Sequence, residues 1–290
     1  MARPLRLIVN PSAGGGRAAR LLPGVEAALR GHGLAFRVDR TTSMDHARAL
    51  AREARDAGEL AVAMGGDGLT GAVAGELRGT DGVLGVLPGG RGNDFARKLG
   101  IGGDPVAACD ILAAGRERAV DVADANGTAF LGIASAGFDS EVNAIANATR
   151  VKLGTLVYLY AALRALSAWQ PAAFELTVDG EPHRFSGYAV AVANSGMFGG
   201  GMQLVPHAEL DDGLLDVVIE RDGPKREYVA CLARVFKGTH VRSPLITFLK
   251  AREVTFHADR RFEAYADGDP VAPLPVTVKV QPAALRVLAP

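Results

Sequence analysis

Three glycine-rich stretches have a composition and spacing typical of phosphate binding. Each follows a short apolar run and precedes a helical pattern: NPSAGGG at 10–16, GGDG at 65–68 and PGGRGND at 88–94. Glycine lacks a Cβ, so its backbone can approach a ligand closely, and the first N–H groups of a helix attract an anion. The carboxyl ends of parallel strands meet at one edge of a sheet. The three stretches therefore predict one nucleotide-sized crevice.

The elements that must position these stretches alternate between strand and helix. Apolar runs at 5–9, 35–38, 60–64 and 83–87 are separated by helical patterns at about 17–30, 44–57 and 70–78. This alternation is typical of a parallel sheet. A helix over about 104–114 and a strand at 119–122 complete the first domain. Beyond Asp121 the chain predicts a β-rich second domain, with strands at 174–178, 188–193, 214–220, 253–257 and 275–280 and helices near 140–148, 154–168 and 225–236.

Composition excludes several classes of protein. The 32 basic and 32 acidic residues cancel, so the overall charge gives no support for a nucleic-acid partner. Cys109 and Cys231 lie in apolar segments and predict buried free thiols in a reducing compartment. No secretion signal is evident, and the apolar run at 153–163 is shorter than the roughly 20 residues that span a bilayer. We expect a cytoplasmic globular protein.

The glycine stretches leave alternatives open. A glycine turn between a strand and a helix can be purely structural. GGGRAA at 14–19, with Asp39 at the end of the second strand, also fits the dinucleotide fingerprint, although that pattern explains neither of the other two stretches. The P-loop pattern is absent, so phosphate binding must rest on backbone amides. A dinucleotide-dependent oxidoreductase and an inactive nucleotide-binding module remain alternatives.

Acidic residues converge on the same predicted crevice. Asp67, Asp94 and Asp121 each follow the end of a predicted strand, where their carboxylates can bind Mg²⁺ directly or through water. Chemistry on a bound phosphate would need such charge neutralisation together with a carboxylate that accepts a proton. Asp267 and Asp269 are two residues apart, and either could be this base. Because the chain has six Asp-Gly pairs, a plain turn is the alternative at Asp267.

The order of these motifs resembles the diacylglycerol kinase catalytic-domain family of lipid kinases, which includes soluble bacterial diacylglycerol kinases and sphingosine kinases. The resemblance covers nearly the whole chain. Residues 10–16 are similar to N-P-x-x-G-x-G, residues 65–68 to G-G-D-G, and residues 88–97 to P-x-G-T-x-N-D-F-A-R. Asp121 aligns with an acid after the fifth strand, residues 212–214 with a D-G-L loop, and residues 267–269 with D-G-E.

The resemblance implies an α/β fold: an N-terminal parallel-sheet nucleotide-binding domain at 1–123, completed by the tail at 281–290, and a C-terminal β-sandwich domain at 124–280. It implies that ATP and Mg²⁺ bind between them. The implied ATP-binding residues are Asn10, Pro11, Gly14, Gly16, Thr41, Gly65, Gly66, Asp67, Gly68, Leu69, Gly90, Arg91 and Asn93. The implied catalytic residues are Asp94, Asp121, Asp267 and Asp269, with Asp269 favoured as base, Asp267 as its close partner and little to separate them.

A second, structural Mg²⁺ is also implied by the resemblance. Its ligands would be the carboxylate of Asp212 and the main-chain oxygens of Glu209 and Leu214. On chemistry alone, this Asp-Gly segment is a hairpin turn.

The chain departs from the family pattern at four places. Leu69 replaces a threonine, as it does in sphingosine kinases, and Gly71-Ala72 replaces Asn-Glu. Arg91 also replaces a threonine and adds a guanidinium that could pair with phosphate oxygens. Asp269 replaces a glutamate, which shortens the reach of the carboxylate by one methylene.

The expected substrate is a membrane lipid. The resemblance favours diacylglycerol, with phosphatidic acid as product, over a sphingoid base or another lipid. An NAD kinase would carry an N-E pair and a T-G-S-T-A-Y-like segment, which the chain lacks. Arg150 and Lys152 precede an apolar segment at 153–166 that suits either bilayer contact or core packing. We expect peripheral contact with the inner face of the membrane, and an edge strand could pair two copies as a homodimer.

Overall fold

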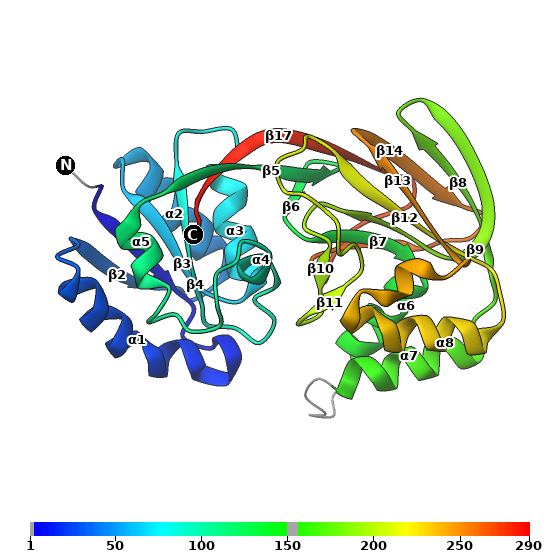
Figure 1. The fold of residues 1–290 in the computed structure, drawn as a ribbon, viewed down its shortest axis with the longest axis horizontal. Helices are drawn as coiled ribbons and strands as arrows, with labels where there is room; N and C mark the ends of the chain where they lie inside the picture. The colour runs from blue at the N-terminus through cyan, green and yellow to red at the C-terminus, as the bar shows by residue number, and fades with distance from the viewer. Residues whose placement is uncertain (1–2, 150–155) are drawn as a thin grey trace.

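The computed structural model describes residues 3–149 and 156–290, which form two lobes (Figure 1). Arg150 and Lys152 lie outside the described residues. The N-terminal lobe alternates strands and helices, as the apolar periodicity predicts. Its elements are β1 (Leu5–Val9), α1 (Ala13–Gly31), β2 (Phe36–Arg40), α2 (Met44–Asp56), β3 (Leu60–Gly65), α3 (Asp67–Leu77), β4 (Val83–Pro88), α4 (Asp94–Lys98) and α5 (Cys109–Ala114).

The C-terminal lobe is rich in strands. β8 alternates buried and exposed residues along its length, the pattern of a strand with one face on the core. The elements that follow α5 are β5 (Glu117–Ala125), β6 (Thr128–Phe130), β7 (Ile133–Gly137), α6 (Phe138–Ala148), α7 (Leu156–Ala168), β8 (Ala172–Val178), β9 (Glu181–Ala193), β10 (Met197–Phe198), β11 (Met202–Gln203), β12 (Leu215–Arg221), α8 (Lys225–Arg234), η1 (Val235–Lys237), η2 (Thr239–Arg242), β13 (Ile246–Ala251), β14 (Glu253–Ala258), β15 (Glu263–Ala266), β16 (Asp269–Pro273) and β17 (Val276–Leu288).

Two long strands connect the lobes. β2, β1, β3 and β4 pair in parallel in that order, and every residue of β1, β3 and β4 is buried because helices cover both faces of the sheet. Arg286 and Val287 of β17 pair in parallel with β4. On its other side, β17 pairs antiparallel with β5 along residues 278–281 and 285–288. Figure 1 shows both strands crossing from one lobe to the other. The C-terminal residues thus complete the N-terminal sheet.

The predicted fold class is confirmed: a parallel α/β lobe followed by a β-rich lobe. The predicted domain limits stay a prediction. Along β5, however, Val122 belongs to the apolar core of the first lobe and Ala123 to that of the second. Seven strands were not predicted from the sequence: β6, β7, β10, β11, β13, β15 and β16. All of them except β13 have five residues or fewer.

Several smaller expectations can be compared with the structure. Cys109 and Cys231 are both buried and form no disulfide. Among the described residues, no helix combines the length and apolar character that crossing a bilayer requires. The helix predicted from residue 104 begins instead at Cys109, and Gly14, Gly15 and Gly16 have left-handed φ values of 59°, 66° and 84°, so the regular part of α1 begins after them.

The loops after β1, β3 and β4 meet through glycine backbone. The N–H groups of Gly89 and Gly90 donate to the carbonyl of Gly65, at 2.8 and 2.9 Å. A Cβ on Gly90 would lie 2.4 Å from the Cα of Gly66, and one on Gly14 would lie 2.7 Å from the carbonyl oxygen of Gly89. Only glycine permits this approach.

We therefore predict that Gly90→Ala lowers the free energy of unfolding by about 1–3 kcal/mol, the usual cost of overpacking. Urea unfolding measures this. Gly71→Ala, inside α3, is the matched control: a Cβ on Gly71 would meet no neighbouring atom within 4 Å, so the substitution should stabilise by up to about 1 kcal/mol. Equal stability of Gly90→Ala and the natural protein would show that the loops can separate freely.

Candidate active site

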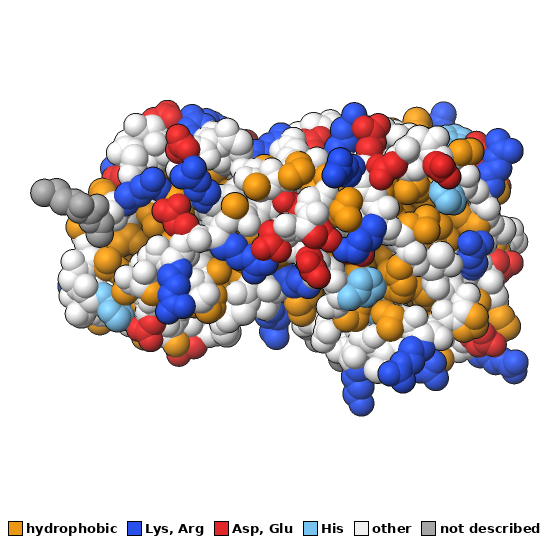
Figure 2. Space-filling view, turned by 45° about the horizontal axis from the view of Figure 1, so that its top comes forward, with side chains coloured by type: hydrophobic (Ala, Val, Ile, Leu, Met, Phe, Trp, Pro, Cys, Tyr) orange, Lys and Arg blue, Asp and Glu red, His pale blue; other side chains and the backbone are white. Residues whose placement is uncertain are grey.

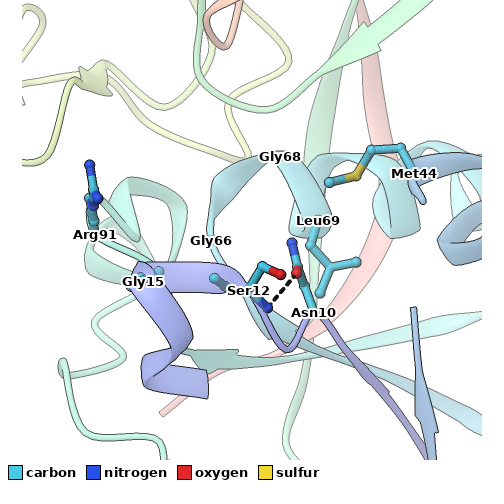
Figure 3. Close-up of a pocket in the computed structure, with 11 residues that line it drawn as sticks. Asn10, Ser12, Gly15, Met44, Gly66, Gly68, Leu69 and Arg91 are labelled. Carbon is cyan, nitrogen blue, oxygen red and sulfur yellow. Dashed lines mark hydrogen bonds between the residues drawn. The ribbon is translucent and has the colours of Figure 1, made fainter. Parts of the chain in front are cut away.

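A cavity of about 340 Å³ opens where the three glycine loops meet (Figure 3). Arg91 and Met44 lie on opposite sides of it in this view, with the glycine backbone between them. The side-chain oxygen of Asn10 accepts a hydrogen bond from the Ser12 N–H at 3.0 Å, which fixes the first loop. The lining residues are Asn10, Ser12, Ala13, Gly14, Gly15, Met44, Gly66, Gly68, Leu69, Gly90 and Arg91.

Seven of the residues expected to bind ATP line this cavity, and the others lie around it. The lining seven are Asn10, Gly14, Gly66, Gly68, Leu69, Gly90 and Arg91, whereas Pro11, Gly16, Thr41, Gly65, Asp67 and Asn93 do not line it. Thr41 is buried, and its hydroxyl lies 3.3 Å from the Val9 carbonyl oxygen, to which it donates. Thr41 does not line the cavity, and its part in binding ATP stays a prediction.

Asn93 holds the third loop through hydrogen bonds to the main chain of Gly90. It has a left-handed φ of 53°, its side-chain oxygen accepts from the Gly90 N–H at 2.9 Å, and its side-chain nitrogen donates to the Gly90 carbonyl at 3.1 Å. Asparagine tolerates this conformation better than most residues. Asn93 thus sets the direction of the Gly90 peptide groups rather than lining the cavity itself.

The sequence analysis missed Met44. It is the first residue of α2, after the Ser43 N-cap whose side chain accepts from the His46 N–H. The signal was present: a Thr-Thr-Ser run at the carboxyl end of β2 begins a helix at the same sheet edge as the glycine loops. Met44 and Leu69 give the cavity an apolar side.

Asp67 and Asp94 lie together beside the loops. One oxygen of Asp67 accepts from the Phe95 N–H at 3.2 Å, and one oxygen of Asp94 accepts from the Gly200 N–H at 2.8 Å. Burial raises the pKa of Asp94; the Gly200 amide acts in the opposite direction, and the charge of Asp67 adds to the rise. Gly200 comes from the β10–β11 hairpin of the other lobe, in a GGG run at 199–201 that the sequence analysis did not single out.

The carboxylates of Asp67 and Asp94 both lie against Gly92. A Cβ on Gly92 would lie 2.7 Å from one oxygen of Asp67 and 3.2 Å from one oxygen of Asp94, so both oxygens border the space that glycine leaves open. The second oxygen of Asp94 is buried without a hydrogen-bond partner among the described residues. Two carboxylates with unused oxygens suit Mg²⁺, which commonly takes one or two carboxylates together with substrate phosphates. The described residues hold no cluster of three or more potential metal-binding side chains.

Asp267 is anchored at the junction of the lobes. Its carboxylate accepts from the N–H groups of Leu131, Gly132 and Ile133, at 2.9–3.3 Å. Asp267 as a whole residue is exposed, but its carboxylate is enclosed by the amides of residues 131–133. Desolvation of this carboxylate raises its pKa to about 6 against the effect of the donors, and the charge of Asp67 adds to the rise. Asp67 thus influences acids of both lobes. Asp267 and Gly268 both have positive φ, as in a tight hairpin between β15 and β16.

Asp269 begins β16 and is exposed. Among the described residues, none donates a hydrogen bond to its carboxylate. The geometry therefore separates the two candidates for the base: the oxygens of Asp267 are used by main-chain amides, and those of Asp269 are available to a substrate.

Asp121 has a different environment from the one expected. Its two oxygens accept from the N–H groups of Gly213 and Ala283, both at 2.7 Å, and its own N–H donates to the Leu210 carbonyl. These contacts tie β5 to the 210–213 turn and to the irregular part of β17. These contacts give Asp121 a connecting role, and its expected catalytic role stays a prediction.

The expected second metal site contains a lysine beside Asp212. The ammonium of Lys250 forms an ion pair with Asp212 and lies 4.0 Å from an oxygen of Asp216. The hydrogen bond with Asp212 raises the pKa of Lys250. Lys250 stands directly opposite Asp216 on the neighbouring strand, so a lysine supplies the positive charge beside Asp212 that a metal was expected to supply. In this structure Lys250 balances the charge of Asp212, and a metal held by Glu209, Asp212 and Leu214 stays a prediction without support from these contacts.

We predict that Lys250→Met lowers the free energy of unfolding at neutral pH by about 1–3 kcal/mol. This is less than for a fully buried pair, because Lys250 is 39% exposed. The substitution removes the lysine charge that faces the buried Asp216 and leaves His207, 3.5 Å from the Asp216 carboxylate, as its nearest basic neighbour. Lys279→Met, which breaks a surface pair with Glu253, is the control and should cost less than about 1 kcal/mol.

The two Lys variants are compared by urea unfolding with and without Mg²⁺. We expect Mg²⁺ to stabilise Lys250→Met more than the natural protein. If Mg²⁺ raised the free energy of unfolding of the natural protein as much as that of Lys250→Met, a metal would bind beside Asp212 even when Lys250 is present. That result would contradict the ion-pair assignment.

Comparisons with known proteins identify the family to which the chain belongs. Residues 4–125 match the family described as the diacylglycerol kinase catalytic domain, and residues 132–289 match the YegS C-terminal NAD kinase beta sandwich-like domain. A diacylglycerol kinase of Mycobacterium tuberculosis is 33% identical over 98% of this chain and 94% of its own length. A diacylglycerol kinase of Bacillus subtilis is 30% identical over 91% of this chain and 89% of its own length.

A crystal structure of a diacylglycerol kinase from Bacillus anthracis has the same fold. It superimposes with a TM-score of 0.79 and 22% sequence identity, covering 99% of this chain and 97% of that one. With the two matching domains and the relatives above, these findings show that the chain belongs to the diacylglycerol kinase catalytic-domain family and is a lipid kinase.

Proposed function

We propose that this lipid kinase transfers the γ-phosphoryl group of ATP to the hydroxyl of diacylglycerol at a membrane surface, giving phosphatidic acid. The observation that carries the proposal is the single cavity formed by three glycine loops, with Asp67 and Asp94 beside it. The relatives named as diacylglycerol kinases support diacylglycerol as the substrate.

The chain's own groups can bind a triphosphate without a P-loop lysine. The three loops line one cavity, where main-chain N–H groups that make no internal hydrogen bond can donate to phosphate oxygens. Those of Gly89 and Gly90 already donate within the protein and hold the loops together. Arg91 adds a guanidinium at the cavity wall, and Met44 with Leu69 offers an apolar surface to a base. Asp67 and Asp94 would hold Mg²⁺, which supplies charge neutralisation at the phosphates when bound.

Asp269 is proposed as the general base. The lipid hydroxyl oxygen attacks the γ-phosphorus, the bond to the β–γ bridging oxygen breaks, ADP leaves, and the hydroxyl proton passes to the Asp269 carboxylate. Asp267 acts as a positioning residue: its three amide contacts to residues 131–133 fix the turn that carries Asp269.

Transfer of radiolabel from ATP to an extracted lipid pool tests the function, and chromatography identifies the labelled lipid. We expect label in phosphatidic acid, and we expect Asp67→Ala to abolish it while circular dichroism shows an unchanged fold. Asp81→Ala is the control because Asp81 is 93% exposed in a surface ion pair. Label in a sphingoid base alone would exclude diacylglycerol, and no labelled lipid would contradict the proposal.

The pH dependence separates the two acids of the 267–269 turn. Because the pKa of Asp267 is raised to about 6, protonation below that pH removes the charge that its three amide donors face. We expect kcat/KM to fall as the pH drops through about 6. In Asp267→Asn this acid limb should shift or disappear while a residual rate remains.

Asp269→Asn should instead lower kcat by about 10²–10⁴-fold at every pH, the usual contribution of a general base. If Asp267→Asn caused that uniform loss and Asp269→Asn left the rate unchanged, the roles of the two acids would be reversed.

A further inference from the structure

Exposed apolar side chains gather on two segments of the C-terminal lobe. Among the described residues, five large apolar side chains are exposed, and one of them, Met44, lines the candidate active site. The other four lie on α7 and on α8–η1: Tyr160 at 43%, Leu163 at 56%, Val229 at 42% and Phe236 at 57% exposed. The two segments meet where the Lys225 ammonium donates to the Leu166 carbonyl at 2.7 Å.

The segment α8–η1 is apolar on two opposite sides. Its inner residues recur at helical spacing and line a small cavity together with β10 and β11: Tyr228, Cys231, Leu232 and Val235. Its outer residues recur at the same spacing and face solvent: Arg226, Val229, Ala233 and Phe236, followed by Lys237. The inner stripe accounts for packing on the core. The outer apolar residues therefore have no explanation in the folding of the described chain.

The surroundings of this outer face are basic. Residues 225–242 contain five basic residues and one acid, Glu227, which gives a charge of +4 by subtraction, in a chain whose net charge is zero. In Figure 2, basic side chains project along the lower edge of the C-terminal lobe, the side on which Figure 1 draws α7 and α8. Exposed aromatic and aliphatic side chains among Lys and Arg are the combination that binds an anionic bilayer surface.

The outer face also lies one hairpin away from the catalytic acids. η1 packs against β11, and Phe198 of β10 and Met202 of β11 line the same small cavity as the inner residues of α8. Gly200, at the tip of this hairpin, donates to Asp94. A lipid drawn from a surface bound at α8–η1 would therefore meet the β10–β11 hairpin before it reached Asp94.

We propose that the outer face of α8–η1, formed by Arg226, Val229, Phe236 and Lys237, docks on the surface of an anionic bilayer. The basic side chains contact lipid phosphates, and Phe236 and Val229 insert among the headgroups. The inference rests on the proposed function in that the substrate is a bilayer lipid. It adds which surface of this chain faces the bilayer.

Co-sedimentation with vesicles tests the docking face. Vesicles of phosphatidylcholine mixed with phosphatidylglycerol are compared with phosphatidylcholine alone, at low and high salt. We expect Arg226→Gln with Lys237→Gln to lower the partition coefficient on anionic vesicles by about 25-fold, at about fivefold per charge. Phe236→Ser should lower it by about tenfold on both kinds of vesicle. Arg184→Gln with Lys279→Gln removes two charges from exposed positions on β9 and β17 and should leave binding nearly unchanged.

Activity on diacylglycerol dispersed in neutral detergent separates docking from catalysis. We expect the Arg226→Gln, Lys237→Gln variant to keep its full rate there and to lose rate only on anionic vesicles. Equal vesicle binding by this variant and the natural protein, or no binding by the natural protein, would overturn the proposal. So would a natural dimer that Phe236→Ser dissociates, since the face would then bind a second copy. If the substitutions weaken vesicle binding but the natural protein phosphorylates no lipid, the proposed function is wrong and the docking face is still supported.

Discussion

The contact between glycine backbones at the carboxyl ends of β1, β3 and β4 is the constraint on which the rest of the site depends. The Gly90 and Gly66 backbones approach too closely for any side chain on Gly90, and Gly14 sits against the carbonyl of Gly89 in the same way. Main-chain N–H groups from three separate loops can converge on one small volume only under this condition. The chain lacks a P-loop lysine. Main-chain N–H groups of the loops held by this contact would therefore take the place of that side-chain phosphate ligand.

A second constraint is the set of contacts that holds the two lobes together near Asp94 and Asp121. β5 and β17 pass through both lobes as paired strands, and Asp121 joins them to the 210–213 turn through two short hydrogen bonds. The Gly200 N–H reaches across to Asp94 at 2.8 Å. Contacts within the chain itself therefore place the acids of the two lobes close together. The connecting strands and the β10–β11 hairpin already bring Asp94 of the first lobe and Asp267 of the second within electrostatic reach of Asp67.

The features that sequence predicted well are those governed by local pattern. Buried runs such as 60–64 and 83–87 are fully apolar because both faces of a parallel sheet are covered, and glycine at a strand end signals a loop of special conformation. Features that depend on long-range pairing were not predictable in this way. Lys250 lies opposite Asp216 only through the register of β12 and β13, and β13 was not predicted at all. Likewise, Gly200 gains its role from a residue more than 100 positions away, Asp94.

The Asp-Gly pairs show why local structure alone does not identify the site. Asp179 and Asp267 both have left-handed φ, at 47° and 51°, and both begin a hairpin turn ahead of a glycine with φ of 90°. Both carboxylates accept main-chain N–H groups from a neighbouring segment: Asp179 from Arg252 and Glu253, and Asp267 from residues 131–133. The two turns are thus the same local structure with the same capping chemistry. They differ in place, because β15 carries the Asp267 turn to the junction beside Asp67, whereas β8 carries the Asp179 turn to the edge of β14. At Asp267, a structural turn and a functional role are therefore compatible. Any Asp-Gly pair can form this turn, and it becomes part of a site when the topology of the sheet places it beside the other acids.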